Sequence, residues 1–168
     1  ILKDPHTGAF AVISVAVLFI VCYGSMSAAL EQVHFKQSLG IAEGDPMLAL
    51  ILIPVVTRCC SAAAVLAGKP LAHSQYREEP DAKKPAAEIT AVCLIGLAAV
   101  TVSLLIGTGF YGVEATWSVP FVLAGAAFAY LAAVFGAVRQ LKGVSGDIAG
   151  YSLTIAEAFA LVMLALLS

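Results

Sequence analysis

The amino-acid sequence predicts an all-α fold, a polytopic bundle of about five membrane-spanning helices that form one domain over residues 1–168. Three observations indicate this fold class. The chain is 61% hydrophobic and 12% charged, with a mean hydropathy of +0.96, whereas a soluble domain carries roughly a quarter charged residues. Five apolar stretches follow one another, and nearly all basic residues lie in alternate gaps between them.

Each apolar stretch meets or nearly meets the length of a membrane span, which is about 20 mostly apolar residues. The stretches are Ala9–Leu30, Met47–Leu66, Ile89–Ile106, Pro120–Val138 and Ile148–Leu167. The first gap ends at a predicted turn, Gly44-Asp45-Pro46. The second, Gly68–Glu88, contains three prolines that block a continuous helix. The third carries Tyr111 and Trp117, which are typical of the membrane interface.

The distribution of basic residues predicts the orientation of the bundle. Five spans place the N-terminus and the second and fourth gaps on one side, and this side holds Lys3, Lys69, Arg77, Lys83, Lys84, Arg139 and Lys142. The opposite side holds only Lys36, in the same outer gap as His34. Because short cytoplasmic loops are enriched in Lys and Arg, we expect the first side to be cytoplasmic, in a multi-pass protein of the cell inner membrane.

Two ionisable residues lie deep inside predicted spans. Arg58 lies eight residues before Leu66, and Glu157 lies nine residues after Ile148. With a rise of 1.5 Å per residue, both lie roughly 12–15 Å below the cytoplasmic face. Charges in the hydrocarbon are costly and usually pair or face a polar interior, so an Arg58–Glu157 contact is predicted. Such a pair either orders the bundle or takes part in binding an anionic substrate.

The segment before the fifth span, Lys142–Gly150, combines three glycines with Ser145 and Asp147. On spacing alone, Asp147 is predicted to be the N-cap of the helix. The alternative is a loop that approaches a phosphate through its backbone, with Asp147 holding a metal ion. Asp147, Gly150, Thr154 and Glu157 recur at helical spacing, so they should form one polar or small stripe that faces protein or a cavity.

The first residues add a second polar cluster on the same face. Lys3 is a candidate phosphate contact, and Asp4 is a candidate second carboxylate for a divalent cation. The alternative is ordinary snorkelling of charges at a membrane boundary. Nucleic-acid binding is not indicated, because the chain has no basic stripe with interleaved aromatics. Zinc and redox chemistry are not indicated either, since Cys22, Cys59, Cys60, Cys93, His6, His34 and His73 share no ligand spacing.

Three segments resemble motifs of the membrane enzyme family of adenosylcobinamide-GDP ribazoletransferase, also called cobalamin synthase. The run from Leu2 to Val12 resembles the family's (K/R)-D-S-R-x-G-x-x-G segment, and Pro54–Arg58 resembles its apolar segment that ends in Ser-Arg. Gly143–Gly150, with Glu157 ten residues after the Asp, resembles its G-G-x-T-G-D-x-x-G segment and downstream Glu. The three matches come in family order and extend over the whole chain.

The resemblance implies a transferase of late cobalamin (vitamin B12) biosynthesis. It would join α-ribazole, or its 5′-phosphate, to adenosylcobinamide-GDP with release of GMP, and Mg²⁺ is the implied cofactor. Asp4 and Asp147 would hold Mg²⁺ or orient substrate, and Glu157 would orient Arg58 or a metal-bound water. The implied substrate-binding residues are Lys3, Arg58, Ser145, Gly146 and Gly150. The implied partners are these small molecules and membrane lipid, and a homo-oligomer is left open.

The chain departs from the family pattern at several positions. Pro5 and His6 stand where the family has Ser-Arg, Val144 stands at its second glycine, and Ser145 replaces its Thr. An acidic segment that the family carries upstream is not within these residues, so we expect the chain to be the C-terminal two-thirds of a longer protein. The principal alternative function is a secondary transporter with an intramembrane polar site. A CDP-alcohol type phosphotransferase and a non-catalytic membrane subunit are further alternatives.

Overall fold

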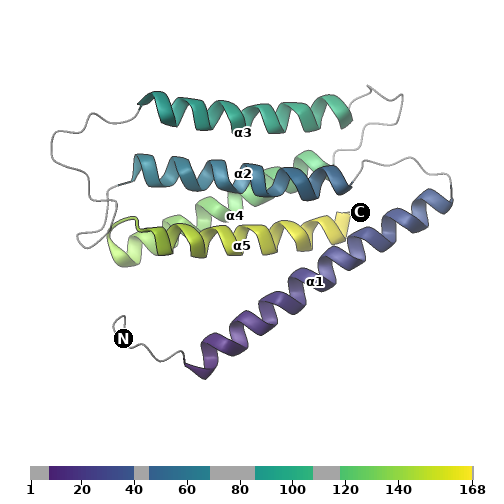
Figure 1. The fold of residues 1–168 in the computed structure, drawn as a ribbon, viewed down its shortest axis with the longest axis horizontal. Helices are drawn as coiled ribbons and strands as arrows, with labels where there is room; N and C mark the ends of the chain where they lie inside the picture. Colours follow the sequence, from purple (N-terminus) through teal and green to yellow (C-terminus); the bar gives the residue numbers. More distant parts are fainter. Residues whose placement is uncertain (1–7, 40–45, 69–85, 108–117, 168) are drawn as a thin grey trace.

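The computed structural model describes residues 8–39, 46–68, 86–107 and 118–167, which form five α-helices and no β-strand. The helices are α1 (Ala9–Ser38), α2 (Pro46–Ala67), α3 (Ala86–Gly107), α4 (Ser118–Leu141) and α5 (Gly146–Leu167) (Figure 1). All five are long and apolar enough to cross a membrane. The predicted all-α fold class is therefore confirmed, and the protein is a multi-pass membrane protein.

The helix α1 is longer than the first predicted span, since it continues from Leu30 to Ser38. The prediction that His34 and Lys36 lie in a loop is therefore wrong, because both belong to the last turns of α1. Hydropathy falls at this point, but Glu, Gln and Lys are good helix formers and no Gly or Pro interrupts them. The Gln32 side chain also holds this extension against α5 by donating to the Ala165 carbonyl at 3.2 Å.

The core of the bundle lies where α2, α4 and α5 pack on one another. The helix α3 runs beside α2 at one edge, and α1 crosses α5 obliquely at the other (Figure 1). The buried face of α5 consists mostly of small side chains, namely Ala149, Ser152, Ala156 and Ala160. Small side chains let membrane helices approach closely, which explains why α4 and α5 are the most extensively paired helices of the bundle.

Large apolar side chains cover the outside of the bundle. Phe10 on α1 is 86% exposed and Phe128 on α4 is 71% exposed, and all five helices carry similar outward-facing residues. An apolar exterior of this extent is destabilising in water and is expected of helices that face lipid or other membrane helices. The first third of α1, Ala9–Val17, is exposed throughout. The helix contacts α5 further along its length, as at Gln32.

Gly68 follows the last residue of α2 and packs closely against Val144, in the turn before α5. A Cβ atom at this position would overlap the Val144 side chain and lie 2.6 Å from the Ala64 carbonyl oxygen. We therefore expect Gly68→Ala to lower the free energy of unfolding in detergent by about 1–3 kcal/mol. Gly24→Ala is the matched control, because nothing lies within 4 Å of a Cβ at Gly24 in α1. Equal thermal midpoints for the two variants would contradict this packing.

Candidate functional site

The predicted contact between the two intramembrane charges is confirmed. Arg58 Nη1 on α2 donates to Glu157 Oε1 on α5 at 3.3 Å. The same carboxylate oxygen lies 3.1 Å from the hydroxyl of Thr57, which is fully buried. The Thr57 hydroxyl also lies 3.0 Å from the Ile53 carbonyl, so its single proton has more than one acceptor within reach. Glu157 is thereby held by two side chains of α2.

The Arg58–Glu157 pair lies at the surface of the described helices. The Arg58 side chain is 64% exposed and the Glu157 side chain is 30% exposed. Charged side chains within membrane spans usually face other protein or a water-filled cavity. We therefore expect this face of α2 and α5 to border such an environment, which an anionic substrate group would need.

Ser145, and not Asp147, caps the N-terminus of α5. The Ser145 hydroxyl accepts from the Ile148 N–H at 3.4 Å, and its carbonyl accepts from the Ala149 N–H at 3.0 Å. The prediction that Asp147 is the N-cap is therefore wrong. The physical reason is that the helix begins at Gly146, which places Asp147 inside the first turn with an exposed side chain. The Asp147 carboxylate makes no hydrogen bond or ion pair with the residues that the structure describes.

The turn before Ser145 is short because Lys142 adopts a left-handed conformation, with φ = 60°. Its N–H still donates to the Val138 carbonyl at 2.8 Å and so closes the last turn of α4. A left-handed conformation costs a non-glycine residue roughly 1–2 kcal/mol. The turn nevertheless brings the end of α4 directly against the start of α5, so that both contribute side chains to the same end of the bundle.

The residues of the predicted polar stripe lie along one side of α5, apart from its buried face. Asp147, Gly150 and Thr154 are exposed and Glu157 is half-buried, whereas Ala149, Ser152 and Ala156 are buried. That this stripe faces protein or a cavity stays a prediction. Nothing lies within 4 Å of a Cβ at Gly150, and the Thr154 hydroxyl donates to the Gly150 carbonyl at 2.9 Å. The stripe thus runs from the start of α5 to the Arg58–Glu157 pair along one side of the helix.

The structure does not bring all predicted site residues into contact. Asp147 and Glu157 lie on one face of α5, but ten residues separate them, which is about 15 Å along the helix axis. Ser145 and Gly146 lie beside Asp147 at the membrane face. Lys3 and Asp4, together with His6, fall outside the residues that the structure describes, so their approach to Asp147 remains a prediction.

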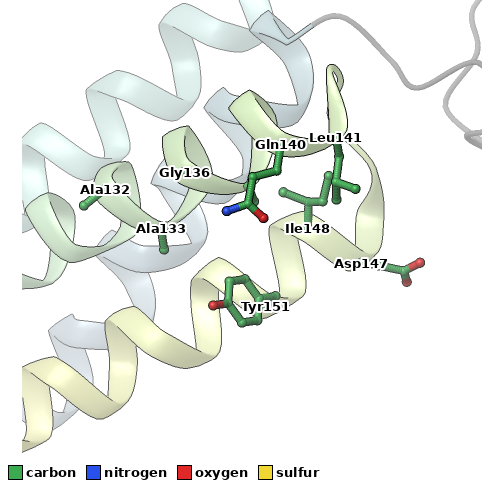
Figure 2. Close-up of a pocket in the computed structure, with 9 residues that line it drawn as sticks. Ala132, Ala133, Gly136, Gln140, Leu141, Asp147, Ile148 and Tyr151 are labelled. Carbon is green, nitrogen blue, oxygen red and sulfur yellow. The ribbon is translucent and has the colours of Figure 1, made fainter. Parts of the chain in front are cut away.

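A groove between α4 and α5 was not predicted from the sequence. It has a volume of about 520 Å³ and is lined by Ala132, Ala133, Gly136, Ala137, Gln140, Leu141, Asp147, Ile148 and Tyr151. Figure 2 shows Gln140 and Tyr151 reaching into the space between the helices, while the Asp147 carboxylate points outward at the rim. The sequence signal for this groove is the set of small residues at helical spacing in α4. These residues indicate a groove only once α5 is known to pack beside them.

Comparison with known proteins identifies the family. A family sequence profile described as cobalamin-5-phosphate synthase matches residues 1–165, nearly the whole chain. The chain belongs to the cobalamin-5-phosphate synthase family. A curated relative, the adenosylcobinamide-GDP ribazoletransferase of Clostridium botulinum (strain Alaska E43 / Type E3), is 27% identical over 163 residues. The match covers 94% of this chain and 55% of the relative, so the chain spans about half of that protein's length. No solved structure matches the chain.

Membership of the cobalamin-5-phosphate synthase family confirms the resemblance predicted from the three motifs, although the identity to the curated relative is low. It connects the chain with cobalamin biosynthesis and does not favour the secondary-transporter alternative.

Whether the described residues could bind Mg²⁺ depends on which oxygen and nitrogen ligands they bring together. In the described ranges, no three His, Cys, Asp or Glu side chains converge. Mg²⁺ is commonly bound through one or two carboxylates together with substrate phosphates and water. A free, exposed Asp147 fits one such carboxylate for an ion that enters with a diphosphate substrate. The described residues do not fit an all-protein cage of ligands.

Proposed function

We propose that the protein is a membrane transferase that joins α-ribazole, or its 5′-phosphate, to adenosylcobinamide-GDP and releases GMP. The observation that carries this proposal is the family match over residues 1–165. The name of the curated relative supports it, because that name combines adenosylcobinamide-GDP with the transfer of ribazole. The exposed Asp147 carboxylate on α5 and the charge pair between α2 and α5 supply groups of the kind that phosphoryl transfer uses.

In the proposed reaction, a ribose hydroxyl of the acceptor attacks the phosphorus nearer to cobinamide. The bond between this phosphorus and the bridging oxygen of the diphosphate breaks, and GMP leaves with the bridging oxygen. The hydroxyl proton passes to a base or to water. The family is described by a product that keeps a 5-phosphate, which supports attack by a ribose hydroxyl other than the 5′ one. Such a transfer depends mainly on positioning and on neutralising charge.

The roles of the residues follow from where they lie. Asp147 would orient the acceptor or be one ligand of Mg²⁺, which when bound would offset the negative charge of the diphosphate. Arg58 would stabilise phosphate oxygens, and Glu157 would position Arg58 through the 3.3 Å contact. Ser145, Gly146 and Gly150 would let the diphosphate approach the start of α5, where free backbone N–H groups favour anions.

Lys3 and Asp4 are proposed to complete this cytoplasmic face as a phosphate contact and a second carboxylate, respectively. Their proposed roles rest on the sequence motif alone, since both precede the described residues. The starts of α1, α3 and α5 and the ends of α2 and α4 lie at the same end of the bundle (Figure 1). Together with the excess of basic residues in these gaps, this supports a cytoplasmic site in the inner membrane.

The reaction is tested with the intact protein purified in detergent. GMP release from adenosylcobinamide-GDP should require α-ribazole or its phosphate, should stop when EDTA removes Mg²⁺, and should resume when Mg²⁺ is restored. Chromatography should show one cobalamin product for each GMP. Release of GMP without an acceptor would indicate a hydrolase, and absence of GMP under all these conditions would contradict the proposed function.

A further inference from the structure

The groove between α4 and α5 changes in polarity along its length. Ala132 and Ala133 lie at its inner end, whereas Gln140 and Asp147 lie at its outer end (Figure 2). Eight residues separate Ala132 from Gln140 on α4, which is about 12 Å along the helix axis. The inner end therefore offers alanine methyl groups, with the Tyr151 hydroxyl directed toward it. The outer end combines the Gln140 carboxamide and the Asp147 carboxylate with the apolar side chains of Leu141 and Ile148.

The groove exists because α4 carries very small side chains along this side. Nothing lies within 4 Å of a Cβ at Gly136, so the position faces open space. The volume of about 520 Å³ falls within the range of about 300–1,000 Å³ that is common for small-molecule sites. Tyr151, which is 58% exposed, contributes an aromatic ring from the α5 side.

We propose that this groove binds the nucleoside acceptor of the transfer, with its flat base toward Ala132 and Ala133 and its ribose at the rim. This inference rests on the proposed function and assigns one substrate to a place in the site. The acceptor is a bicyclic benzimidazole base on a ribose, so one end is flat and apolar and the other carries hydroxyls. Its polarity therefore runs in the same direction as that of the groove.

Three side chains at the groove can each contact a different part of such an acceptor. The Tyr151 ring can stack on the base, as aromatic side chains commonly do with nucleobases. The Gln140 carboxamide can exchange hydrogen bonds with ribose hydroxyls, because it both donates and accepts. Asp147 follows at the rim, where its exposed carboxylate points outward, and the assignment requires this side chain to rotate toward a ribose hydroxyl.

The other substrate does not match this groove. A corrinoid macrocycle with its side chains is far larger than about 520 Å³. A guanine base would fit by size, but its edge carries several donors and acceptors that the alanines at the inner end cannot satisfy. The donor substrate is therefore assigned to the polar stripe on α5 and the acceptor to the groove.

Filling the groove tests the assignment. In the intact protein, Gly136→Leu should raise the KM for α-ribazole by about tenfold or more and leave the KM for adenosylcobinamide-GDP within about twofold. Because nothing lies within 4 Å of a Cβ at Gly136, the leucine side chain should extend into the groove without displacing the helix backbone, so folding should be retained. Gly24→Leu is the matched control, since it makes the same change in an equally open position on α1 and should alter neither KM.

The stacking contact is tested separately at Tyr151. Tyr151→Phe keeps the ring and should leave the KM for α-ribazole within about twofold, whereas Tyr151→Ala should raise it about fivefold or more. If both substitutions raise this KM equally, the hydroxyl matters and stacking is contradicted.

Three results would overturn the inference. An unchanged KM for α-ribazole in Gly136→Leu would mean that the groove holds lipid or nothing. A rise confined to the KM for adenosylcobinamide-GDP would assign the groove to the donor. Loss of folding in Gly136→Leu alone would make the groove a packing surface for another helix.

Direct binding separates this inference from the proposed function. Equilibrium dialysis of α-ribazole against the detergent-solubilised protein needs no turnover. Binding that Gly136→Leu weakens by about tenfold or more, in a protein that releases no GMP, would support the groove and contradict the transferase. Turnover by the wild-type protein with acceptor affinity unaffected by Gly136→Leu would support the transferase and overturn the groove.

Discussion

Replacing Asp147 with asparagine should lower the rate of GMP release by about 10²–10³-fold, which is the usual loss when one charge-stabilising group is removed from an active site. The substitution keeps the size of the side chain and removes only its charge and its capacity to bind a cation. Under the proposed function, this carboxylate orients the acceptor or is one ligand of Mg²⁺. The measurement is the initial rate of GMP release at saturating substrates and Mg²⁺.

The structure makes Asp147→Asn a clean test because folding should be nearly unaffected. Ser145 caps α5, so the asparagine loses only the favourable interaction of a first-turn carboxylate with the helix dipole, about 0.3–1 kcal/mol. Asp147→Glu serves as the control that retains the charge, and it should recover part of the activity. An Asp147→Asn protein that folds, inserts and turns over within fivefold of the wild type would remove Asp147 from the mechanism.

Exchanging the charges of the intramembrane pair should restore folding but not activity. Arg58→Glu alone places two carboxylates side by side at membrane depth, and Glu157→Arg alone does the same with two guanidinium groups, so each should reduce the yield of folded protein sharply. The double variant recreates an ion pair of opposite polarity. Its Thr57 hydroxyl can still donate to the Ile53 carbonyl at 3.0 Å, so this buried donor keeps an acceptor.

The activity of the exchanged pair distinguishes its two possible roles. If Arg58 stabilises phosphate oxygens, the folded double variant should lose about 10²–10³-fold in rate, because the cation has moved to the other helix. If the pair only orders the bundle, the double variant should work nearly as well as the wild type. Thermal unfolding in detergent, measured on the same samples, shows whether each preparation is folded before its rate is compared.

Hydropathy and charge counting were sufficient to predict the number, order and approximate limits of the helices. They underestimated α1, because the sequence beyond Leu30 turns polar while remaining favourable for a helix. The Arg58–Glu157 contact was predictable because equal depth in antiparallel spans can be calculated from residue counts alone. The motif resemblance was confirmed by a family match of nearly full length.

Features that depend on local geometry or on helix packing were not predictable in the same way. Ser145 and Asp147 are both good N-cap residues, and only the hydrogen bond from the Ile148 N–H distinguishes them. The groove requires knowing that Gly136 of α4 and Tyr151 of α5 line the same space. Neither residue is unusual for a membrane helix, so the sequence alone offered no reason to select them.

The short turn from Lys142 to Ser145 makes α4 and α5 a helical hairpin, and all the described residues that line the groove belong to this hairpin, within residues 132–151. The described lining is therefore encoded by one contiguous piece of the chain and includes no residue of α1, α2 or α3. Substitutions at a few neighbouring positions can therefore change the shape of the groove without disturbing the charge pair, which joins α5 to α2. Under the proposed assignment, preference for one acceptor base over another can thus change between relatives while the rest of the bundle is maintained.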